Sequence, residues 1–335
     1  MSATPPPSPT YALVCRAYGN PPQIAVEPWA RPNTPAAGEV VIDVNCAALN
    51  FTDHLMMQGR YQDRPSLPFV PGLDAAGTVH AVGAGVTHLK PGDVVVSSGV
   101  VGAYASQLVA PARRVILLPP GLSPQDAVAS INSHLTAYHG LVDRAALKAG
   151  ERVLVLGASG AVGRAAMQLA AHLGAQLYSV ERAAEGRLSL RDHTHDRTVT
   201  VESAALRQGL KELLGPRGAD IVVDPVGDLY TEPAVRALAW RGRLLVIGFA
   251  AGAIPSVPMN LLLLKGASLV GVYCGGLLAN EEAQFTTQLA RVFDLLAEGV
   301  LTPNAWEATP ARAFADAWQR FSAPRGAKVL LDFGR

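Results

Sequence analysis

Charged residues are scarce in this sequence. Asp, Glu, Lys and Arg together make up 16% of its 335 residues, and the formal net charge is +1. A basic surface of the kind that binds nucleic acid is therefore not expected. Long apolar runs are also missing, because a run such as the four leucines between Asn260 and Lys265 is far too short to span a bilayer. Neither nucleic acid nor a membrane is expected as a partner.

Cysteine is rare as well. The three cysteines, Cys15, Cys46 and Cys274, are widely spaced and odd in number, so they form neither a zinc pattern nor a disulfide framework. This usage fits a reducing compartment, and we predict a cytoplasmic protein. The opening MSATPPPSPT lacks the charged and apolar regions of a signal peptide. We expect residues 1–10 to be a disordered tail.

The most informative stretch runs from Arg152 to Gly174. A short apolar run, typical of a buried strand, leads directly into a glycine turn and then into strong helix formers. The dinucleotide fingerprint G-x-G-x-x-G is met as Ala158-x-Gly160-x-x-Gly163. Gly160 would let the backbone approach a pyrophosphate, and Gly163 would let the helix pack closely on its strand. An ordinary tight turn between a strand and a helix would contain similar glycines.

A second apolar strand strengthens the dinucleotide interpretation. It runs from Gln176 to Val180 and is followed by Glu181, about 20 residues after the central glycine, where dinucleotide folds place a ribose-binding acid. Glu181 would accept a hydrogen bond from the 2′-hydroxyl of NADH and repel the 2′-phosphate of NADPH. Arg182 and Arg187 would bind that phosphate. Both effects are roughly 1–3 kcal/mol, so these residues leave the choice of cofactor open.

The second half of the chain alternates between strands and helices. Strands are predicted at Ala219–Asp224, Gly242–Gly248 and Ser268–Val272, and a helix is predicted from Tyr230 to Trp240. Such alternation predicts a doubly wound parallel sheet with right-handed crossovers, whose ligands bind at the carboxyl ends of the strands.

The first part of the chain differs in composition and in its predicted secondary structure. From Tyr11 to about Ser123 it is β-rich and dense in glycine and proline, which predicts a small barrel-like domain. Residues 281–298 form one amphipathic helix with a single apolar face. The last predicted strand, Lys328–Asp332, returns to the first domain, so the α/β domain is an insertion.

From about Tyr11 onward the chain resembles the medium-chain dehydrogenase/reductases, specifically the zinc-free quinone oxidoreductase branch. The motifs that carry the resemblance are Ala48–Asp53, Gln58–Tyr61, Pro68–Gly77, Leu89–Val94, Leu135–Tyr138, Lys148–Val155, the glycine turn, Asp224–Gly227 and Ile247–Gly252. The resemblance implies a GroES-like β-rich catalytic domain at residues 11–127 and 275–335. It also implies a Rossmann NAD(P)-binding domain at residues 128–274.

The resemblance also bears on zinc. Zinc-dependent members have a cysteine where this chain has Asn50, a histidine where it has Leu73 and a cysteine where it has Asn132. Leucine offers no donor atom to zinc, and Val94–Ala110 contains no cysteine for a structural zinc site. We therefore predict no zinc, and Cys46 is interpreted as a small buried hydrophobic residue. The remaining chemistry is hydride transfer from NADPH, with NADH as the alternative donor, to a quinone or a conjugated enone.

Tyr61 is the candidate catalytic residue, because the stretch Asn50–Tyr61 is similar to enoyl-thioester reductases in which the matching tyrosine donates a proton. The alternative is that Tyr61 packs in a loop or lines the pocket. Asn50 is expected to position a polar atom of the nicotinamide or substrate, and Asp53 to cap the helix that follows. The resemblance implies the following cofactor-binding positions: Thr136, Ser159, Gly160, Ala161, Val162, Gly163, Glu181, Arg182, Arg187, Val226, Gly248, Phe249, Val272 and Tyr273.

Alternatives remain for several residues and for the function. Thr136 would otherwise bond its own helix backbone. His134 is expected to be structural, and His193 and His195 to lie on a surface loop without metal. The leading hypothesis is a quinone oxidoreductase. The second is an enoyl-thioester or enone reductase, and the third is a cofactor-binding structural protein of low activity. Residues 268–273 would leave an apolar sheet edge, so a homodimer is predicted.

Overall fold

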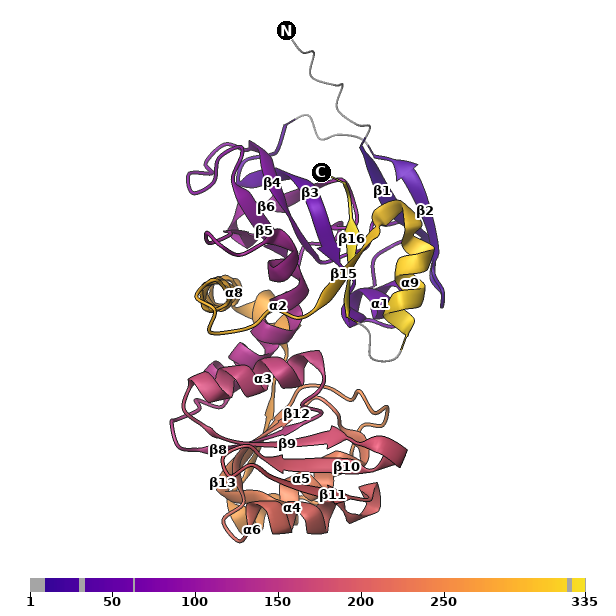
Figure 1. The fold of residues 1–335 in the computed structure, drawn as a ribbon. Helices are drawn as coiled ribbons and strands as arrows, with labels where there is room; N and C mark the ends of the chain where they lie inside the picture. Colours follow the sequence, from indigo (N-terminus) through magenta and orange to yellow (C-terminus); the bar gives the residue numbers. More distant parts are fainter. Residues whose placement is uncertain (1–9, 30–33, 63, 324–326, 335) are drawn as a thin grey trace. The chain divides into compact units, whose positions relative to one another are not determined.

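The computed structural model describes residues 10–29, 34–62, 64–323 and 327–334 (Figure 1). Apart from Thr10, the predicted tail lies outside these residues. The described chain divides into two compact units. The β-rich unit comprises residues up to 131, 281–297 and 303 onward, and the α/β unit comprises residues 132–280 and 298–302. The predicted domain boundaries after residues 127 and 274 are close to these limits and remain a prediction.

Within the described residues, the β-rich unit contains a seven-stranded sheet in the order β15-β16-β3-β4-β5-β7, with β6 also paired to β3, and a separate pair β1-β2. Its strands are β1 (Tyr11–Ala17), β2 (Gln23–Pro28), β3 (Glu39–Ala48), β4 (Asp74–Val82), β5 (Val94–Ser98), β6 (Gln107–Pro111), β7 (Val115–Leu117), β15 (Trp306–Pro310) and β16 (Lys328–Asp332). Its helices are α1 (Phe51–Met57), α8 (Glu282–Ala297) and α9 (Phe314–Ser322).

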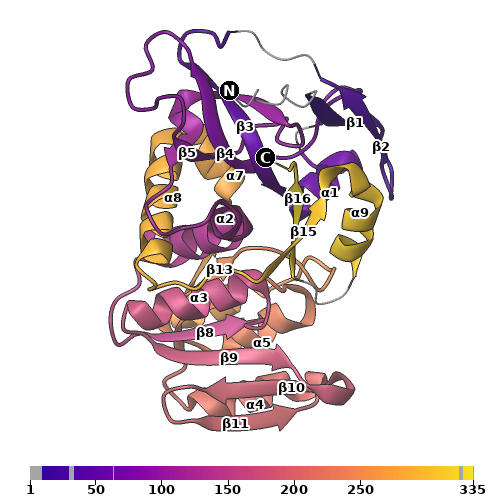
Figure 2. The ribbon, with the colours of Figure 1, turned by 45° about the horizontal axis from the view of Figure 1, so that its top comes forward.

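The prediction for the end of the chain is confirmed. Strand β16 lies between β15 and β3, parallel to the first and antiparallel to the second, as Figure 2 shows. Helix α8 buries the apolar face that the sequence predicted, including Phe285, Leu289 and Phe293. Fully buried side chains such as Ile42 and Tyr104 form the core of this unit, and each large apolar side chain contributes about 1.5–3 kcal/mol by its burial.

In the α/β unit, the described strands form one sheet in the order β11-β10-β9-β8-β12-β13-β14. These strands are β8 (Arg152–Leu156), β9 (Gln176–Arg182), β10 (Leu188–Asp192), β11 (Arg197–Val201), β12 (Ala219–Asp224), β13 (Leu238–Val246) and β14 (Ser268–Gly271). Its helices are α3 (Ala161–His172), α4 (Leu206–Leu214), α5 (Thr231–Arg236), α6 (Asn260–Lys265) and α7 (Cys274–Asn280). Helix α2 (Pro124–Tyr138) contains the boundary between the units and continues into a π-helical turn at His139–Arg144.

The expectation of a wholly parallel sheet is wrong at one side of this unit. Strands β9, β8, β12, β13 and β14 are parallel, but β10 runs antiparallel to β9, and β11 runs antiparallel to β10. Only residues 183–187 join β9 to β10, and a parallel crossover needs a dozen or more residues. Leu188 and Leu190 are buried in the same core as Tyr178, which fixes the register of the hairpin.

The helix predicted from Tyr230 to Trp240 is also too long. Helix α5 ends at Arg236, and strand β13 begins at Leu238, which pairs with Ala219 of β12. The side chain of Leu238 is 1% exposed, so burial against β12 outweighs the helix-forming tendency of this stretch. Across the described ranges, no helix is both long and apolar enough to cross a membrane.

Candidate active site

The glycine turn joins β8 to α3 in the α/β unit. The N–H of Gly157 donates to the carbonyl of Val180 at 2.8 Å, and the N–H of Gly160 donates to the carbonyl of Gly157 at 2.9 Å. Helix α3 begins at Ala161, and no side chain caps its N-terminus. The first N–H groups of a helix lack partners within it and carry the positive end of its dipole. This turn therefore offers several N–H donors to an anionic group.

The two glycines of the fingerprint have different roles. A Cβ at Gly163 would lie 2.3 Å from the carbonyl oxygen of Gly157 and 2.7 Å from the Cα of Ala158, so only glycine fits there. A Cβ at Gly160 would meet only the carbonyl oxygen of Gly157, at 3.2 Å, and Gly160 is exposed. The turn is thus tightly packed at Gly163, against Gly157 and Ala158, and open to solvent at Gly160. It fits the pyrophosphate of a dinucleotide, with Ser159, Ala161 and Val162 around it.

The two predicted phosphate-binding arginines have different surroundings. Arg187 lies 3.3 Å from the Glu202 carboxylate and donates to the carbonyl of Thr200 at 3.5 Å. Arg182 is exposed at the end of β9, and its side chain has no ion pair with any described residue. Glu181, the predicted ribose acid, is half-buried beside it. Arg182 is therefore the better placed of the two arginines to bind an added phosphate.

The loops after β12 and β13 meet the glycine turn at the carboxyl edge of the sheet. Asp224 accepts hydrogen bonds from the N–H of Val226 at 2.9 Å, which fixes the first loop. A Cβ on Gly157 would be 2.8 Å from the side chain of Val226, so this loop contacts the glycine turn. The N–H of Ala251 donates to the carbonyl of Val226 at 2.9 Å, which ties the Gly248–Phe249 loop to the same place.

Thr136 lies beside the segment that follows β14. Its hydroxyl donates to the carbonyl of Asn132 at 2.6 Å and lies 3.5 Å from the sulfur of Cys274. The backbone bond that the alternative interpretation expected is therefore present, and the neighbouring segment contains Val272 and Tyr273. Val272 is buried, and Tyr273 is half exposed. Burial raises the pKa of the Cys274 thiol to about 11, so this group is neutral at pH 7.

A buried polar cluster lies in the β-rich unit. The Asn50 amide nitrogen donates to Asp74 at 2.8 Å, and the ammonium group of Lys328 donates to the Asn50 amide oxygen. The carboxylate of Asp53 accepts from the N–H of Asn50 at 2.8 Å, which caps α1 as predicted, and from the hydroxyl of Tyr104 at 3.1 Å. We call these five residues the Asn50 cluster. Asn50 itself is 2% exposed.

Burial dominates the electrostatics of the Asn50 cluster. Burial, reinforced by the nearby Asp74, raises the pKa of Asp53 to about 7, while the N–H of Asn50, Lys328 and Tyr104 act in the opposite direction. Burial also raises the pKa of Asp74 and lowers the pKa of the Lys328 ammonium group. Sequence reasoning missed Asp74, Tyr104 and Lys328 as site residues. These three residues come close to Asn50 and Asp53 only in the folded unit, so no local signal in the sequence marks them.

Tyr61 follows α1 after a turn at Gly59, whose φ is +69°. The N–H of Arg60 donates to the carbonyl of Leu55 at 2.9 Å, which continues the turn. Tyr61 is half-buried and packs against the core of the β-rich unit, as does Leu73. The structure thus places Tyr61 in the same unit as Asn50. Its role as a proton donor stays a prediction.

The histidines have ordinary partners. His134 bonds the carbonyl of Thr302 at 3.2 Å through Nε2, and His195 pairs with Asp192 at 2.8 Å at the β10–β11 turn. His193 bonds the hydroxyl of Ser179 at 2.9 Å. In the part of the chain that the structure describes, no group of three or more His, Cys, Asp or Glu side chains could hold a metal ion. Cys46 is 2% exposed, as expected for a buried apolar residue.

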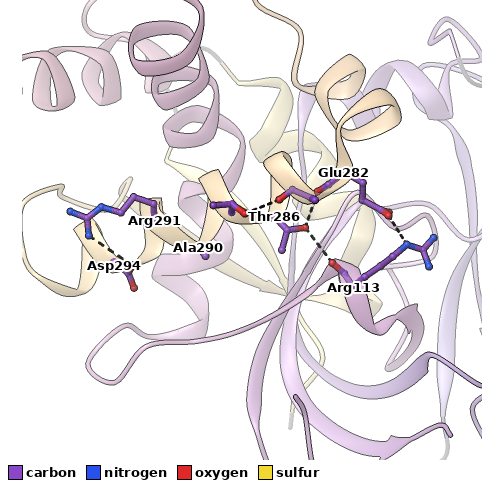
Figure 3. Close-up of a pocket in the computed structure, with 8 residues that line it drawn as sticks. Arg113, Glu282, Thr286, Ala290, Arg291 and Asp294 are labelled. Atoms are coloured by element: carbon purple, nitrogen blue, oxygen red, sulfur yellow. Dashed lines mark hydrogen bonds and ion pairs between the residues drawn. The ribbon is translucent and has the colours of Figure 1, made fainter. Parts of the chain in front are cut away.

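A groove also runs along α8 (Figure 3). Its volume is about 680 Å³, and Arg113 and Glu282 form an ion pair at one end. The hydroxyl of Thr286 donates to the carbonyl of Arg113 at 3.2 Å, so the polar groups here bind one another. None of the residues that line this groove belongs to the predicted site.

Comparison with known proteins places the chain in a family. Residues 36–120 match the alcohol dehydrogenase GroES-like domain, and residues 161–293 match the zinc-binding dehydrogenase domain. Quinone oxidoreductase-like protein 2 of Bos taurus is 33% identical over 313 residues, which cover 92% of this chain and 89% of that protein. The chain belongs to the quinone oxidoreductase-like medium-chain dehydrogenase/reductases. The predicted GroES-like and Rossmann-type fold is confirmed.

Solved structures of other proteins share this fold. A probable oxidoreductase from Mycobacterium abscessus is 30% identical with a TM-score of 0.77, and the match covers 98% of this chain and all of that one. A mycobacterial protein solved in complex with NADPH is 26% identical with a TM-score of 0.79, covering 96% and 99% of the two chains. The chain is therefore an oxidoreductase, and its family and its glycine turn both support NAD(P)H binding.

Proposed function

We propose that this protein is a zinc-independent, NADPH-dependent reductase that transfers hydride to a quinone or another conjugated carbonyl compound. The observation that carries the proposal is the pair of positions where zinc-dependent relatives hold the metal. Asn50 uses both atoms of its amide within a buried cluster, and Leu73 offers no donor atom. An acceptor that is already electrophilic needs no Lewis acid, and a quinone needs no strong protein acid for its reduction.

The residues of the α/β unit would hold and orient the cofactor. The N–H groups at the start of α3 would bind the pyrophosphate, and Glu181 and Arg182 would contact the adenosine ribose. Thr136, Val272 and Tyr273 would flank the nicotinamide ring. Bound NADPH supplies the hydride, and the protein supplies position and a site that excludes water. In the β-rich unit, Asn50 would contact a polar atom of the acceptor.

A second function on the same scaffold is reduction of enoyl thioesters or enones. This reaction needs a proton at the α-carbon after hydride arrives at the β-carbon. Tyr61 favours this candidate, because a hydrogen-bonded turn after α1 fixes its backbone in the unit that also holds Asn50.

A cofactor-binding protein of low activity is the third possibility, and steady-state assays with quinones and enones separate it from both enzymes. We place the protein in the cytoplasm, because its three cysteines are all unpaired.

Titration with both cofactors tests the proposal. We expect NADPH to bind more tightly than NADH, and Arg182→Ala to weaken NADPH binding about 10- to 100-fold without changing NADH binding, because one charge-assisted contact is lost. Arg187→Ala is the matched control, since its guanidinium group already pairs with Glu202. Cofactor fluorescence measures both affinities. Tighter NADH binding would make Glu181 the ribose acid, and no binding of either cofactor would refute the proposed function.

We also propose a homodimer that pairs β14 with its symmetry mate. Strand β14 is the last strand of its sheet, and Leu269 is 38% exposed on it. Leu263 and Leu264 on α6, which packs against the neighbouring β13, are largely exposed as well. Light scattering at micromolar concentration should give twice the 35.0 kDa mass of one chain, and Leu269→Lys should shift the protein toward monomer. A monomeric wild-type protein would contradict the dimer.

A further inference from the structure

The Asn50 cluster is assembled at one end of three adjacent strands. Asn50 lies two residues beyond the end of β3, and β3 lies between β16 and β4 in the sheet. Lys328 is the first residue of β16, and Asp74 is the first residue of β4. The two charged side chains therefore reach Asn50 from opposite sides. Lys328 binds the amide oxygen, and Asp74 binds the amide nitrogen.

This pair of partners permits a single orientation of the Asn50 amide. An ammonium group can only donate, so it must face the oxygen, and an ionised carboxylate can only accept, so it must face the nitrogen. The hydroxyl of Ser98 donates to the other oxygen of Asp74 at 2.7 Å, which favours the ionised form of that carboxylate. If the amide were rotated by half a turn, its N–H donors would face the ammonium group of Lys328, and its oxygen would face the carboxylate of Asp74.

Stability alone does not account for this cluster. Asp74 and Asp53 are 5% and 0% exposed, and the charged end of Lys328 is buried with them. Buried ion pairs of this kind are often replaceable by apolar residues at no loss of stability. The bond from Lys328 to the amide oxygen also polarises the amide, which makes its N–H groups stronger donors. One of the two N–H groups is used by Asp74, and the second is left with a fixed direction.

We propose that Lys328 and Asp74 are positioning residues that orient and polarise the Asn50 amide for contact with the acceptor. This inference rests on the proposed function, which assigns that contact to Asn50. Asp53 completes the cluster. Its second oxygen, Oδ1, is buried without a hydrogen-bond partner among the described residues, and this oxygen would carry a proton when Asp53 is neutral. When Asp53 is protonated, the cluster carries one positive charge, on Lys328, and one negative charge, on Asp74.

Lys328→Met and Asp74→Asn test the proposal. We expect each to lower kcat about tenfold or more, as loss of an oriented donor does, with NADPH affinity within twofold of wild type. Removing the cation should move the pH at which Asp53 loses its proton upward, and removing the neighbouring carboxylate should move it downward. The groups that face Asp53 are Asp74, Lys328 and the Tyr104 hydroxyl. The kcat–pH profiles of the two variants should therefore shift in opposite directions.

Lys265→Met is the matched control, because Lys265 donates to backbone carbonyls on α5 and β13 of the α/β unit and touches no part of the Asn50 cluster. It should leave kcat and its pH profile unchanged. Lower kcat in Lys328→Met and Asp74→Asn without opposite shifts would overturn the proposal. So would a loss of NADPH affinity that accompanies the loss of kcat, because it would indicate a general disturbance of the fold.

A readout without turnover separates this inference from the proposed function. In protein labelled with ¹⁵N-asparagine, the side-chain amide signal that disappears in Asn50→Ser belongs to Asn50. We expect its protons to exchange slowly with solvent in the wild-type protein and much faster in Lys328→Met. Fast exchange in the wild-type protein would refute an oriented amide, whatever the acceptor. Slow exchange in a protein that reduces neither quinones nor enones would refute the proposed function. It would show an oriented amide but refute its role in contacting an acceptor.

Discussion

Replacing Gly163 by valine is expected to abolish measurable binding of both NADPH and NADH. A Cβ at this position would lie 2.3 Å from the carbonyl oxygen of Gly157, and this contact is with backbone that cannot move without opening the turn. An opened turn misplaces the N–H groups at the start of α3. The loss of two such charge-assisted hydrogen bonds, each worth about 1.5–3 kcal/mol, lowers affinity more than about 100-fold. Fluorescence titration measures the loss for both cofactors.

Gly160→Ala is the matched variant for this experiment. Gly160 has an ordinary φ of −75°, and a Cβ there would meet only one protein atom, at 3.2 Å. We expect unchanged thermal unfolding and about tenfold weaker cofactor binding, because the methyl group would occupy the space in front of the turn. Gly163→Val should in addition unfold more easily, by about 1–3 kcal/mol, because of overpacking. Wild-type affinity in Gly163→Val would show that the cofactor does not use this turn.

If the protein reduces enones, Tyr61→Phe should lower the enone rate by about 10²- to 10⁴-fold and leave quinone reduction nearly intact. The reason is that a positioned general acid contributes this much to a reaction that needs a proton at carbon. Reduction of a quinone ends with protons on oxygen, which water can supply. The measurement is kcat/KM for a quinone and an enone with the same cofactor, in wild type and variant.

Tyr18→Phe is the control for Tyr61→Phe. Its hydroxyl donates to the carbonyl of Pro65, and its ring packs near Gly59, so it supports the same turn without a predicted role in proton transfer. Loss of this hydroxyl should change both acceptor rates by the same factor. An equal loss on both acceptors in Tyr61→Phe would indicate a packing role for Tyr61. No loss on either acceptor would remove Tyr61 from the mechanism.

In the α/β unit, the sequence predicted those elements whose residues are all consecutive in the chain. The turn from β8 to α3 is such a case, because strand, glycines and helix are consecutive. The strands β12 and β14 were placed within a residue for the same reason. The prediction around His193 and His195 was a surface loop, whereas these residues lie in the turn of the β10–β11 hairpin. Its own alternation of apolar and polar residues matches a strand pair.

The Asn50 cluster shows what the sequence could not predict. Asp74 is 24 positions from Asn50, and Lys328 is 278 positions away, so only the order of strands in the sheet brings them together. Nothing local distinguishes Lys328 from a lysine at the exposed start of a strand. The difference between Arg182 and Arg187 was equally hidden, because Glu202 reaches Arg187 through the hairpin fold.

The position of β16 between β15 and β3 has a consequence for synthesis of the protein. The α/β unit, apart from residues 298–302, is continuous in the chain and can complete its sheet while the ribosome is still at work. The β-rich unit begins first but finishes last. Strand β6 pairs with β3 at Glu39–Asp43, but the same edge of β3 stays open at Cys46–Ala48 until residues 328–332 emerge. Such an edge can pair with other strands. In the last stage of synthesis, the α/β unit is therefore already folded while the sheet of the β-rich unit is still incomplete.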